Sequence, residues 1–287
     1  MKPLVYAGLA AAALLVASLA AAQPAALVEG VQSPAWVERA GTRTPIAPGM
    51  ALQPGDVVHT GAGSRLLVRL AERSLLKLGE NGQLRFTELA PTLELFRAAL
   101  GVLQGAFRFT TDVAAKARRR EVNVTVATVT AGIRGTDFWG RSRDNTEIVC
   151  LIEGAVEVAA PNEPPVRMDQ PRQFYRRVAG QAQPIGLVEP AQLQEWAQET
   201  EIQAGRGAAR AGGRFQVHLA RLETQDAALA LYDAVRAAGY PAEIRPVRQE
   251  AGMVYIVRIR NLPSRAEAQA LASRLRGQHG VVNPTPQ

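Results

Sequence analysis

The feature that most constrains the fold is a series of short apolar segments, separated by Gly, Asn, Asp and Pro, that extends over residues 25–188. Many of these segments alternate apolar and polar residues, and helical periodicity is scarce, which is typical of β-strands. The clearest expected strands are 57–60, 66–70, 75–78, 122–126 and 148–151. We therefore predict a mainly β, all-β domain over residues 25–188.

Turn residues separate the expected strands. Gly55-Asp56 and Gly154 are predicted turn positions, because glycine relieves backbone strain and aspartate can bond its own backbone. Asn81-Gly82 is the strongest hairpin signal, since both residues tolerate the positive φ that a tight turn demands. We predict a β-hairpin at this pair.

The sequence pattern changes over residues 189–213. The first part, from Glu189 to Ala204, is expected to form a short amphipathic helix, with Pro190 at an N-terminal helical position. The segment 205–213 contains only Gly, Ala and Arg and has no pattern that could form a core. We expect it to be a flexible linker between two independent domains.

Residues 214–283 are predicted to form a small α+β domain with the order β-α-β-β-α-β. Alternation over 215–219 and 254–260 predicts strands. A helix over 224–238 would place one apolar set on a single face, comprising Ala227, Ala228, Leu231, Ala234 and Val235. Two such units give a four-stranded antiparallel sheet with helices on one face and the other face open.

Helix boundaries in this small domain are marked by specific residues. Ser264 is expected to cap the second helix, with Glu267 at the capping-box distance. Gly239 and Gly277 follow the two helices and are expected to end them.

The N-terminus has the pattern of a secretory signal peptide. Lys2 precedes an uncharged run from Leu4 that ends in small residues at Ala22. We predict a signal peptide at 1–22, cleaved after Ala22. A retained transmembrane anchor is the alternative, but the run is rich in alanine and borderline in length. No cysteine lies near the site for lipid attachment, so we expect a periplasmic protein without a stable transmembrane anchor.

The charge balance favours anionic surroundings. The net charge is +7, almost wholly from arginine, with a pI of about 10.1. Lipid headgroups, wall polymers and nucleic acid all fit, and export makes nucleic acid the least suitable. A basic group comprising Lys116, Arg118, Arg119 and Arg120 is expected in a solvated loop, with contact to an acidic partner or lipid as the alternative. Cys150, the single cysteine, is expected to be buried.

Three segments, 215–220, 237–242 and 255–259, resemble SPOR domains in order and spacing. The resemblance implies binding of peptidoglycan glycan strands across the open sheet face, especially strands without stem peptides, and enrichment at the division septum. It assigns glycan binding to the first strand with the loop after it, and to the third strand, namely Gln216, His218, Arg221, Arg258 and Arg260. The family often has glutamine where His218 stands, and a Gly-Pro pair where Arg260 and Asn261 stand.

Alternation agrees with this assignment. It places Phe215, Val217 and Leu219 under the helices, and Gln216 and His218 on the open side. A sugar chain needs such polar donors. The alternative is that these residues are ordinary solvated positions on an exposed sheet.

Segments 52–61, 134–138 and 152–158 resemble the FecR domain. In membrane-anchored FecR proteins this domain is periplasmic and takes part in sensing an outer-membrane transporter and controlling a sigma factor. Only a signal peptide precedes it here, so transmembrane signalling is not expected. The resemblance implies a ligand- or protein-interaction module; the alternative function is a periplasmic sensor or scaffold whose main partner is another envelope protein.

Enzymatic and nucleic-acid functions lack the residues they require. The three histidines, His59, His218 and His279, are far apart in sequence, and no H-E-x-x-H, paired cysteines or G-x-S-x-G motif occurs. We expect no catalysis, no metal and no cofactor. The sheet architecture is shared with RNA-recognition domains, but the third strand offers only Tyr255 as an aromatic, and alternation places it on the buried side.

Overall fold

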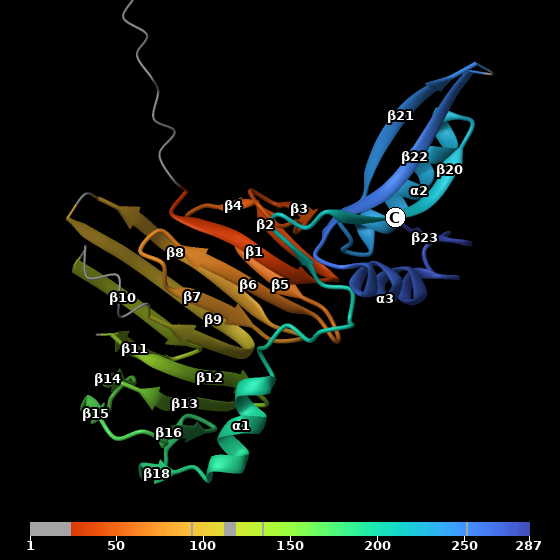
Figure 1. Ribbon diagram of the computed structural model, residues 1–287. Helices are drawn as coiled ribbons and strands as arrows, with labels where there is room; N and C mark the ends of the chain where they lie inside the picture. The colour runs from red at the N-terminus through yellow and green to blue at the C-terminus, as the bar shows by residue number, and fades with distance from the viewer. Residues whose placement is uncertain (1–23, 93, 112–118, 134, 251) are drawn as a thin grey trace, which may run out of the picture.

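A computed structural model describes residues 24–92, 94–111, 119–133, 135–250 and 252–287 (Figure 1). The predicted signal peptide, Lys116, Arg118 and Arg134 lie outside these ranges. Within the described ranges, no helix has both the length and the apolar character needed to cross a membrane.

The N-terminal domain contains two sheets. The strands of the first, in spatial order, are β19 (Ala209–Arg210), β1 (Ala26–Gln32), β6 (Arg65–Leu70), β7 (Leu75–Leu78), β9 (Leu95–Thr110), β12 (Asp137–Arg143), β13 (Thr146–Glu153) and β16 (Gln173–Val178). Three short strands extend it, with β1 pairing to β4 (Ala51–Leu52), and β16 pairing to β17 (Gln181–Ala182) and β18 (Gly186–Leu187).

The second sheet shares β9 with the first. Its strands, in spatial order, are β3 (Thr42–Pro45), β2 (Ala35–Arg39), β5 (Val57–Thr60), β8 (Gln83–Pro91), β9, β10 (Arg119–Val126), β11 (Val129–Ile133), β14 (Val156–Ala159) and β15 (Val166–Met168). The β9–β10 pair is parallel and the others are antiparallel. These strands confirm the predicted all-β class, and β5 and β7 have the predicted bounds.

Strand β9 passes from one sheet to the other at Gly105. Gln104 still pairs with β8 of the second sheet, whereas Gly105 pairs with β12 of the first. Gly105 has a φ of +89°, and a Cβ there would lie 2.6 Å from the Cα of Gly82. Glycine is therefore needed for both the bend and the close approach. The two halves of β9 contribute buried aromatics to one core, including Phe96, Phe107 and Phe109.

The predicted hairpin at Asn81-Gly82 is wrong. Asn81 does adopt a positive φ of +50°, so the turn itself is present. The strands that it joins, however, belong to different sheets: β7 pairs with β6 and β9, and β8 pairs with β5 and β9. The turn packs against the bend of β9, which gives each flanking strand a different half of β9 as its partner.

The other predicted turns are confirmed. Gly55 and Gly154 have φ values of +92° and +89°. Asp56 accepts a hydrogen bond from the backbone N–H of Gln53 at 2.8 Å, so its carboxylate bonds the backbone of this turn, although the donor is three residues earlier and not two residues further on.

Helix α1 (Pro190–Gln198) covers part of the outer face of the first sheet (Figure 1). The predicted short helix is therefore present, but it ends at Gln198 and not at Ala204. Trp196 of α1 stacks on Trp139 of β12, with ring centroids 4.8 Å apart. Both belong to a second, smaller apolar cluster that contains Cys150. Cys150 is fully buried as predicted, and burial raises the pKa of its thiol to about 12.

The C-terminal domain has the predicted β-α-β-β-α-β order. Its antiparallel sheet has the spatial order β21 (Glu243–Gln249), β22 (Gly252–Leu262), β20 (Phe215–Leu222) and β23 (Thr285–Pro286), with helices α2 (Gln225–Ala237) and α3 (Arg265–Leu275). The fourth strand lies beyond the predicted domain end at residue 283. Gly239 and Gly277, with φ values of +87° and +75°, follow the helices as expected.

The apolar face of α2 is narrower than predicted. Ala228, Leu231 and Val235 are buried, whereas Ala227 and Ala234 are exposed. The sheet therefore contacts a stripe at i, i+3 and i+7, and the predicted positions beside this stripe face solvent.

The segment 205–213 is not a flexible linker in the structure. The Glu267 carboxylate accepts hydrogen bonds from the backbone N–H groups of Gly205, Gly207 and Ala208, at 2.6, 2.6 and 3.0 Å. Strand β19 within the segment pairs with β1. Ser264 caps α3 as predicted, by accepting from the Glu267 N–H at 3.2 Å, but the carboxylate of Glu267 binds this segment.

The two domains also contact each other directly. The Ala35 N–H donates to the Gly239 carbonyl at 3.1 Å, and Arg274 of α3 donates to the Ser33 carbonyl at 2.9 Å. A Cβ at Gly239 would lie 2.6 Å from the Trp36 ring. These contacts, with the ordered segment, join the domains into a docked pair, which differs from the predicted independence.

Candidate functional site

The two faces of the C-terminal sheet differ. Helices α2 and α3 cover one face, where Val217, Leu219, Val257 and Ile259 are buried. The other face, called the open face below, carries the five predicted site residues, Gln216, His218, Arg221, Arg258 and Arg260. The structure therefore brings together all the residues that sequence reasoning selected; alternation accounts for Gln216, His218 and Arg258, and a bulge accounts for Arg221.

The centre of the open face is a hydrogen-bonded network. Arg258 is opposite His218 on β20 and opposite Glu243 on β21. Its Nε donates to Glu243 Oε1 at 3.1 Å, and a terminal nitrogen donates to Gln216 Oε1 at 3.1 Å. Arg260 Nε lies 3.3 Å from the same oxygen of Glu243. Glu243 thus holds two arginines in place, a role that the sequence analysis did not assign to it.

Arg221 reaches the open face because β20 contains a bulge. Strict alternation from His218 would place Arg221 on the helix side. The register shifts between His218 and Ala220, however, so that Arg221 pairs with Ile256 and shares a face with His218. The resemblance to SPOR domains implied that Arg221 lies in the loop after the first strand. In the structure it lies within strand β20.

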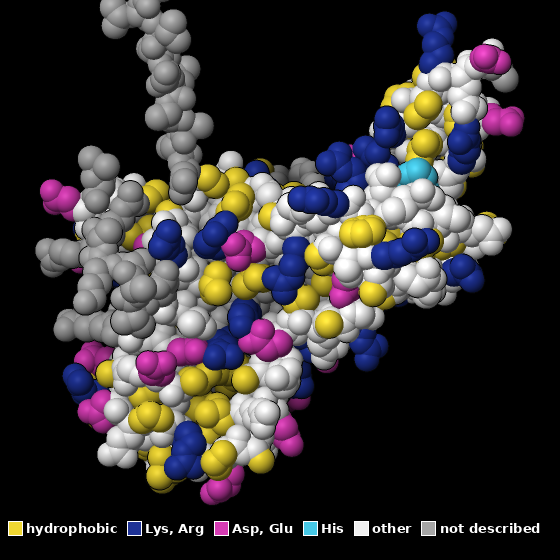
Figure 2. Space-filling view, viewed as in Figure 1, with side chains coloured by type: hydrophobic (Ala, Val, Ile, Leu, Met, Phe, Trp, Pro, Cys, Tyr) yellow, Lys and Arg dark blue, Asp and Glu magenta, His cyan; other side chains and the backbone are white. Residues whose placement is uncertain are grey.

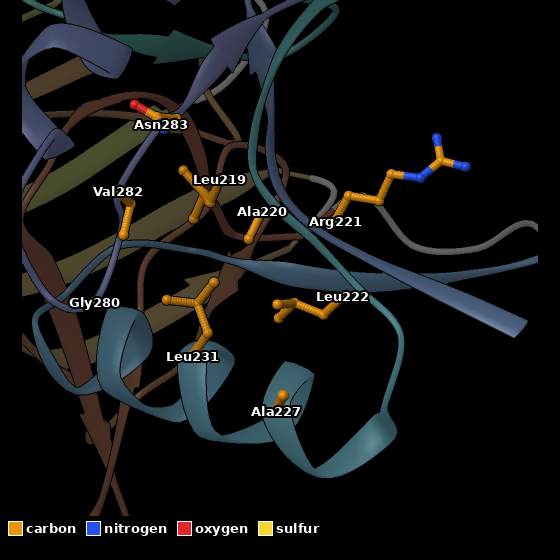
Figure 3. Close-up of a pocket in the computed structure, with 9 residues that line it drawn as sticks. All are labelled: Leu219, Ala220, Arg221, Leu222, Ala227, Leu231, Gly280, Val282 and Asn283. Atoms are coloured by element: carbon orange, nitrogen blue, oxygen red, sulfur yellow. The ribbon is translucent and has the colours of Figure 1, made fainter.

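The close-up in Figure 3 agrees with this orientation. It shows an apolar cavity of about 440 Å³ on the helix side, between the end of β20, the start of α2 and residues 280–283. Leu219 and Leu231 point toward each other there, and the guanidinium of Arg221 points away from them.

His218 is held in the neutral form at neutral pH. Burial lowers the pKa of its imidazole, and the nearby positive charges of Arg258, Arg245 and Arg221 lower it further. A neutral imidazole offers one donor and one acceptor, so it can bind a hydroxyl group in either direction.

The arginines of the open face are of two kinds. The Arg258 side chain is 13% exposed and already has partners, whereas the Arg260 side chain is 52% exposed. Arg221 is also exposed. The face therefore combines a fixed centre with two guanidinium groups that are accessible to a ligand.

The surroundings of the face are basic. Residues 214–287 contain ten arginines against six carboxylates. On the side of the molecule shown in Figure 2, Lys and Arg side chains lie across the C-terminal domain and its boundary with the N-terminal domain, and many Asp and Glu side chains lie over the end that holds β13 and β16. Tyr255 packs against the core opposite Leu222, as predicted, so it is not placed to stack on a base.

The described ranges contain no group of three or more His, Cys, Asp and Glu side chains that could hold a metal ion. His59 and His218 lie in different domains, and the pKa of His59 is also lowered, chiefly by burial and then by Arg43.

The FecR-like segments of the N-terminal domain have structural roles in the described part of the chain. Asp56 is 1% exposed and accepts two hydrogen bonds of 2.7 Å from Arg39. A Cβ at Gly154 would lie 2.4 Å from the Gly135 carbonyl oxygen, so glycine allows these two turns to pack together. Sequence reasoning missed Arg39, because a partner 17 residues away leaves no local pattern.

These features define a two-domain protein, in which a two-sheet β domain is followed by an α+β module with an open sheet face. Comparison with protein families identifies both parts. Residues 56–157 match the FecR protein family, and residues 211–284 match the SPOR domain family. The chain therefore contains a FecR domain followed by a C-terminal SPOR domain.

Comparison with solved structures finds two crystal structures of a candidate anti-sigma factor from Parabacteroides distasonis. Each is 13% identical in sequence to this protein, and each alignment covers 69% of this chain. The alignments cover 97% and 96% of the two anti-sigma factor chains, with TM-scores of 0.41 and 0.40. No curated protein matches the sequence.

Proposed function

We propose that this protein is exported to the periplasm and binds peptidoglycan glycan strands on the open face of its SPOR domain, while the FecR domain serves as a ligand- or protein-interaction module. The observation that carries the proposal is the grouping of Gln216, His218, Arg221, Arg258 and Arg260 on the face of the C-terminal sheet that α2 and α3 leave uncovered. The match to the SPOR domain supports it.

The chemistry of the face suits a glycan without stem peptides. Hydroxyl and acetamido groups of the sugars can bond to Gln216 and to the neutral His218. Removal of the stem peptide leaves a free carboxylate on the lactyl group of the sugar, and Arg221 and Arg260 can bind this anion. An exposed sheet without a deep cleft can accept a long linear polymer at any position along its length. This specificity would direct the protein to the division septum.

The test is sedimentation of the mature protein with purified sacculi, before and after an amidase removes stem peptides. We expect stronger binding to the treated sacculi. The triple variant Gln216→Ala, His218→Ala, Arg258→Ala should lose most binding. A matched control, Gln225→Ala, Arg265→Ala, Gln269→Ala, removes the same numbers of arginines and neutral polar residues from exposed positions of the two helices and should bind normally. Equal binding by both variants would refute the assignment.

The second candidate function is a periplasmic sensor or scaffold whose main partner is another envelope protein. The FecR match over residues 56–157 favours it, since this family takes part in sensing. In that case, the triple variant, which should not bind glycan, would still bind a specific envelope protein through residues 24–188. Crosslinking in intact cells with the triple variant separates the two functions.

A further inference from the structure

A polar cavity of about 350 Å³ lies where the two domains and the segment that connects them meet. It is distinct from the open face. The N-terminal domain contributes Arg65 and Glu80, the connecting segment contributes Gln203 and Arg206, and the C-terminal domain contributes Tyr240 and Arg274.

The cavity has an excess of positive charge. Three arginines, Arg65, Arg206 and Arg274, line it, against one acidic residue, Glu80. Glu80 accepts a hydrogen bond from the Gly63 N–H at 2.8 Å and lies 3.8 Å from a terminal nitrogen of Arg65. Within the described ranges, neither Arg206 nor Arg274 forms an ion pair with a carboxylate.

The donors of the cavity are only partly used. Arg274 donates to two backbone carbonyls, those of Ser33 and Arg206. The Arg65 side chain is 9% exposed, and one terminal nitrogen donates to the Ser64 carbonyl, whereas its Nε has no hydrogen-bond partner among the described residues. A buried guanidinium without full compensation is unfavourable, and a bound anion would offset this cost.

We propose that this cavity binds an oxyanion, a carboxylate or a phosphate group, that bridges the FecR and SPOR domains. Guanidinium groups bind both anions through paired hydrogen bonds, and three arginines line this cavity. The volume fits a small ligand and not a glycan chain. Because the ligand contacts both domains and the connecting segment, its binding would stabilise the docked arrangement. The site goes beyond the proposed glycan function and does not depend on it.

The Tyr240 hydroxyl supplies a neutral donor at this site. Burial raises the pKa of its phenol, so the group stays protonated. A protonated phenol beside guanidinium groups adds a hydrogen bond to the anion without adding negative charge.

The test is titration calorimetry and thermal unfolding of the mature chain with two probes, inorganic phosphate and the dipeptide L-Ala-γ-D-Glu, each against sodium chloride of equal ionic strength. Saturable binding of phosphate alone indicates a phosphate source, and binding of the dipeptide indicates wall-peptide carboxylates. Arg206→Gln, at an exposed position, should reduce the affinity for the probe that binds about tenfold or more. It should leave the melting temperature of the protein without ligand unchanged.

The matched control is Arg276→Gln, an exposed arginine at the end of α3 that does not line the cavity. It removes the same charge and should bind as the parent does. The proposal is overturned if neither probe binds more tightly than chloride, or if Arg206→Gln and Arg276→Gln bind equally well.

Discussion

The N-terminal and C-terminal domains use β-sheets in opposite ways. In the N-terminal domain, residues from both sheets form a common core, and α1 covers part of the remaining outer face. In the C-terminal domain, helices cover one face of the sheet and leave the other open. Alternation along a strand therefore has different consequences in the two places: it fills a core in the first and presents polar side chains for binding in the second.

The two domains also differ in how arginine is used. Arg39 donates twice to the buried carboxylate of Asp56, and this hydrogen bonding, more than the charge attraction, raises the pKa of Arg39. Arg221 and Arg260 on the open face are exposed. We infer that Arg39 stabilises the first domain, whereas Arg221 and Arg260 of the second are available to a ligand.

The largest expected difference between the domains concerns stability. Trp139 is fully buried and stacks on Trp196, so Trp139→Ala should lower the free energy of unfolding by about 3–5 kcal/mol. Arg221→Ala, on the open face, should change it by no more than about 0.5 kcal/mol. Denaturant titration of both variants checks this, and similar losses would show that the open face is part of the structural framework.

A smaller loss of stability is expected at the contact between Glu267 and the segment that connects the domains. Glu267→Ala removes an acceptor that binds three backbone N–H groups, so the loss should be about 3 kcal/mol. Residues 205–213 should then become sensitive to limited proteolysis. Glu223→Ala, an exposed glutamate in the same domain, is the control and should leave cleavage unchanged. Resistance of both variants to cleavage would mean that other contacts hold the segment.

The smallest expected effect is a pH dependence on the open face. The folded-state pKa of His218 is lowered, so the unfolded chain binds a proton more readily than the folded protein. The folded protein therefore has its full free energy of unfolding, as far as His218 is concerned, above the unfolded pKa of about 6.5. This free energy decreases as the pH falls below that value, because the unfolded chain then takes up the proton first. His218→Gln should therefore reduce the loss of stability between about pH 7.5 and about pH 5.5.

Denaturant titrations of parent and variant at the two pH values measure this effect. Part of the pH dependence should remain in the variant, because the pKa of His59 is also lowered. Identical pH dependence in parent and variant would contradict the account of His218.

Local patterns predicted what depends on local interactions. Alternation and capping residues were sufficient for the β-α-β-β-α-β order, for the Ser264 cap and for the grouping of Gln216, His218 and Arg258. The positive φ of Asn81 was also predictable, but its strand pairing was not, because the partners of β7 and β8 are set by the distant bend at Gly105.

Long-range contacts account for the remaining differences. The Gly, Ala and Arg composition of residues 205–213 predicts a segment outside any core, yet Ala208 and Ala209 are buried, and Glu267, about 60 residues away, orders the segment. Likewise, Glu243 holds Arg258 and Arg260 from a neighbouring strand, and no spacing in the sequence predicts that contact.

The central claim is that the exposed arginines of the open face bind glycan without holding the fold together. The most direct measurement is the affinity of the double variant Arg221→Ala, Arg260→Ala for amidase-treated sacculi, with thermal unfolding recorded on the same samples. We predict a melting curve close to that of the parent and an affinity reduced about a hundredfold or more, since each of the two lost charged donors contributes about 1.5–3 kcal/mol and about 1.4 kcal/mol corresponds to a tenfold change. Parental affinity with an unchanged melting curve would contradict the claim.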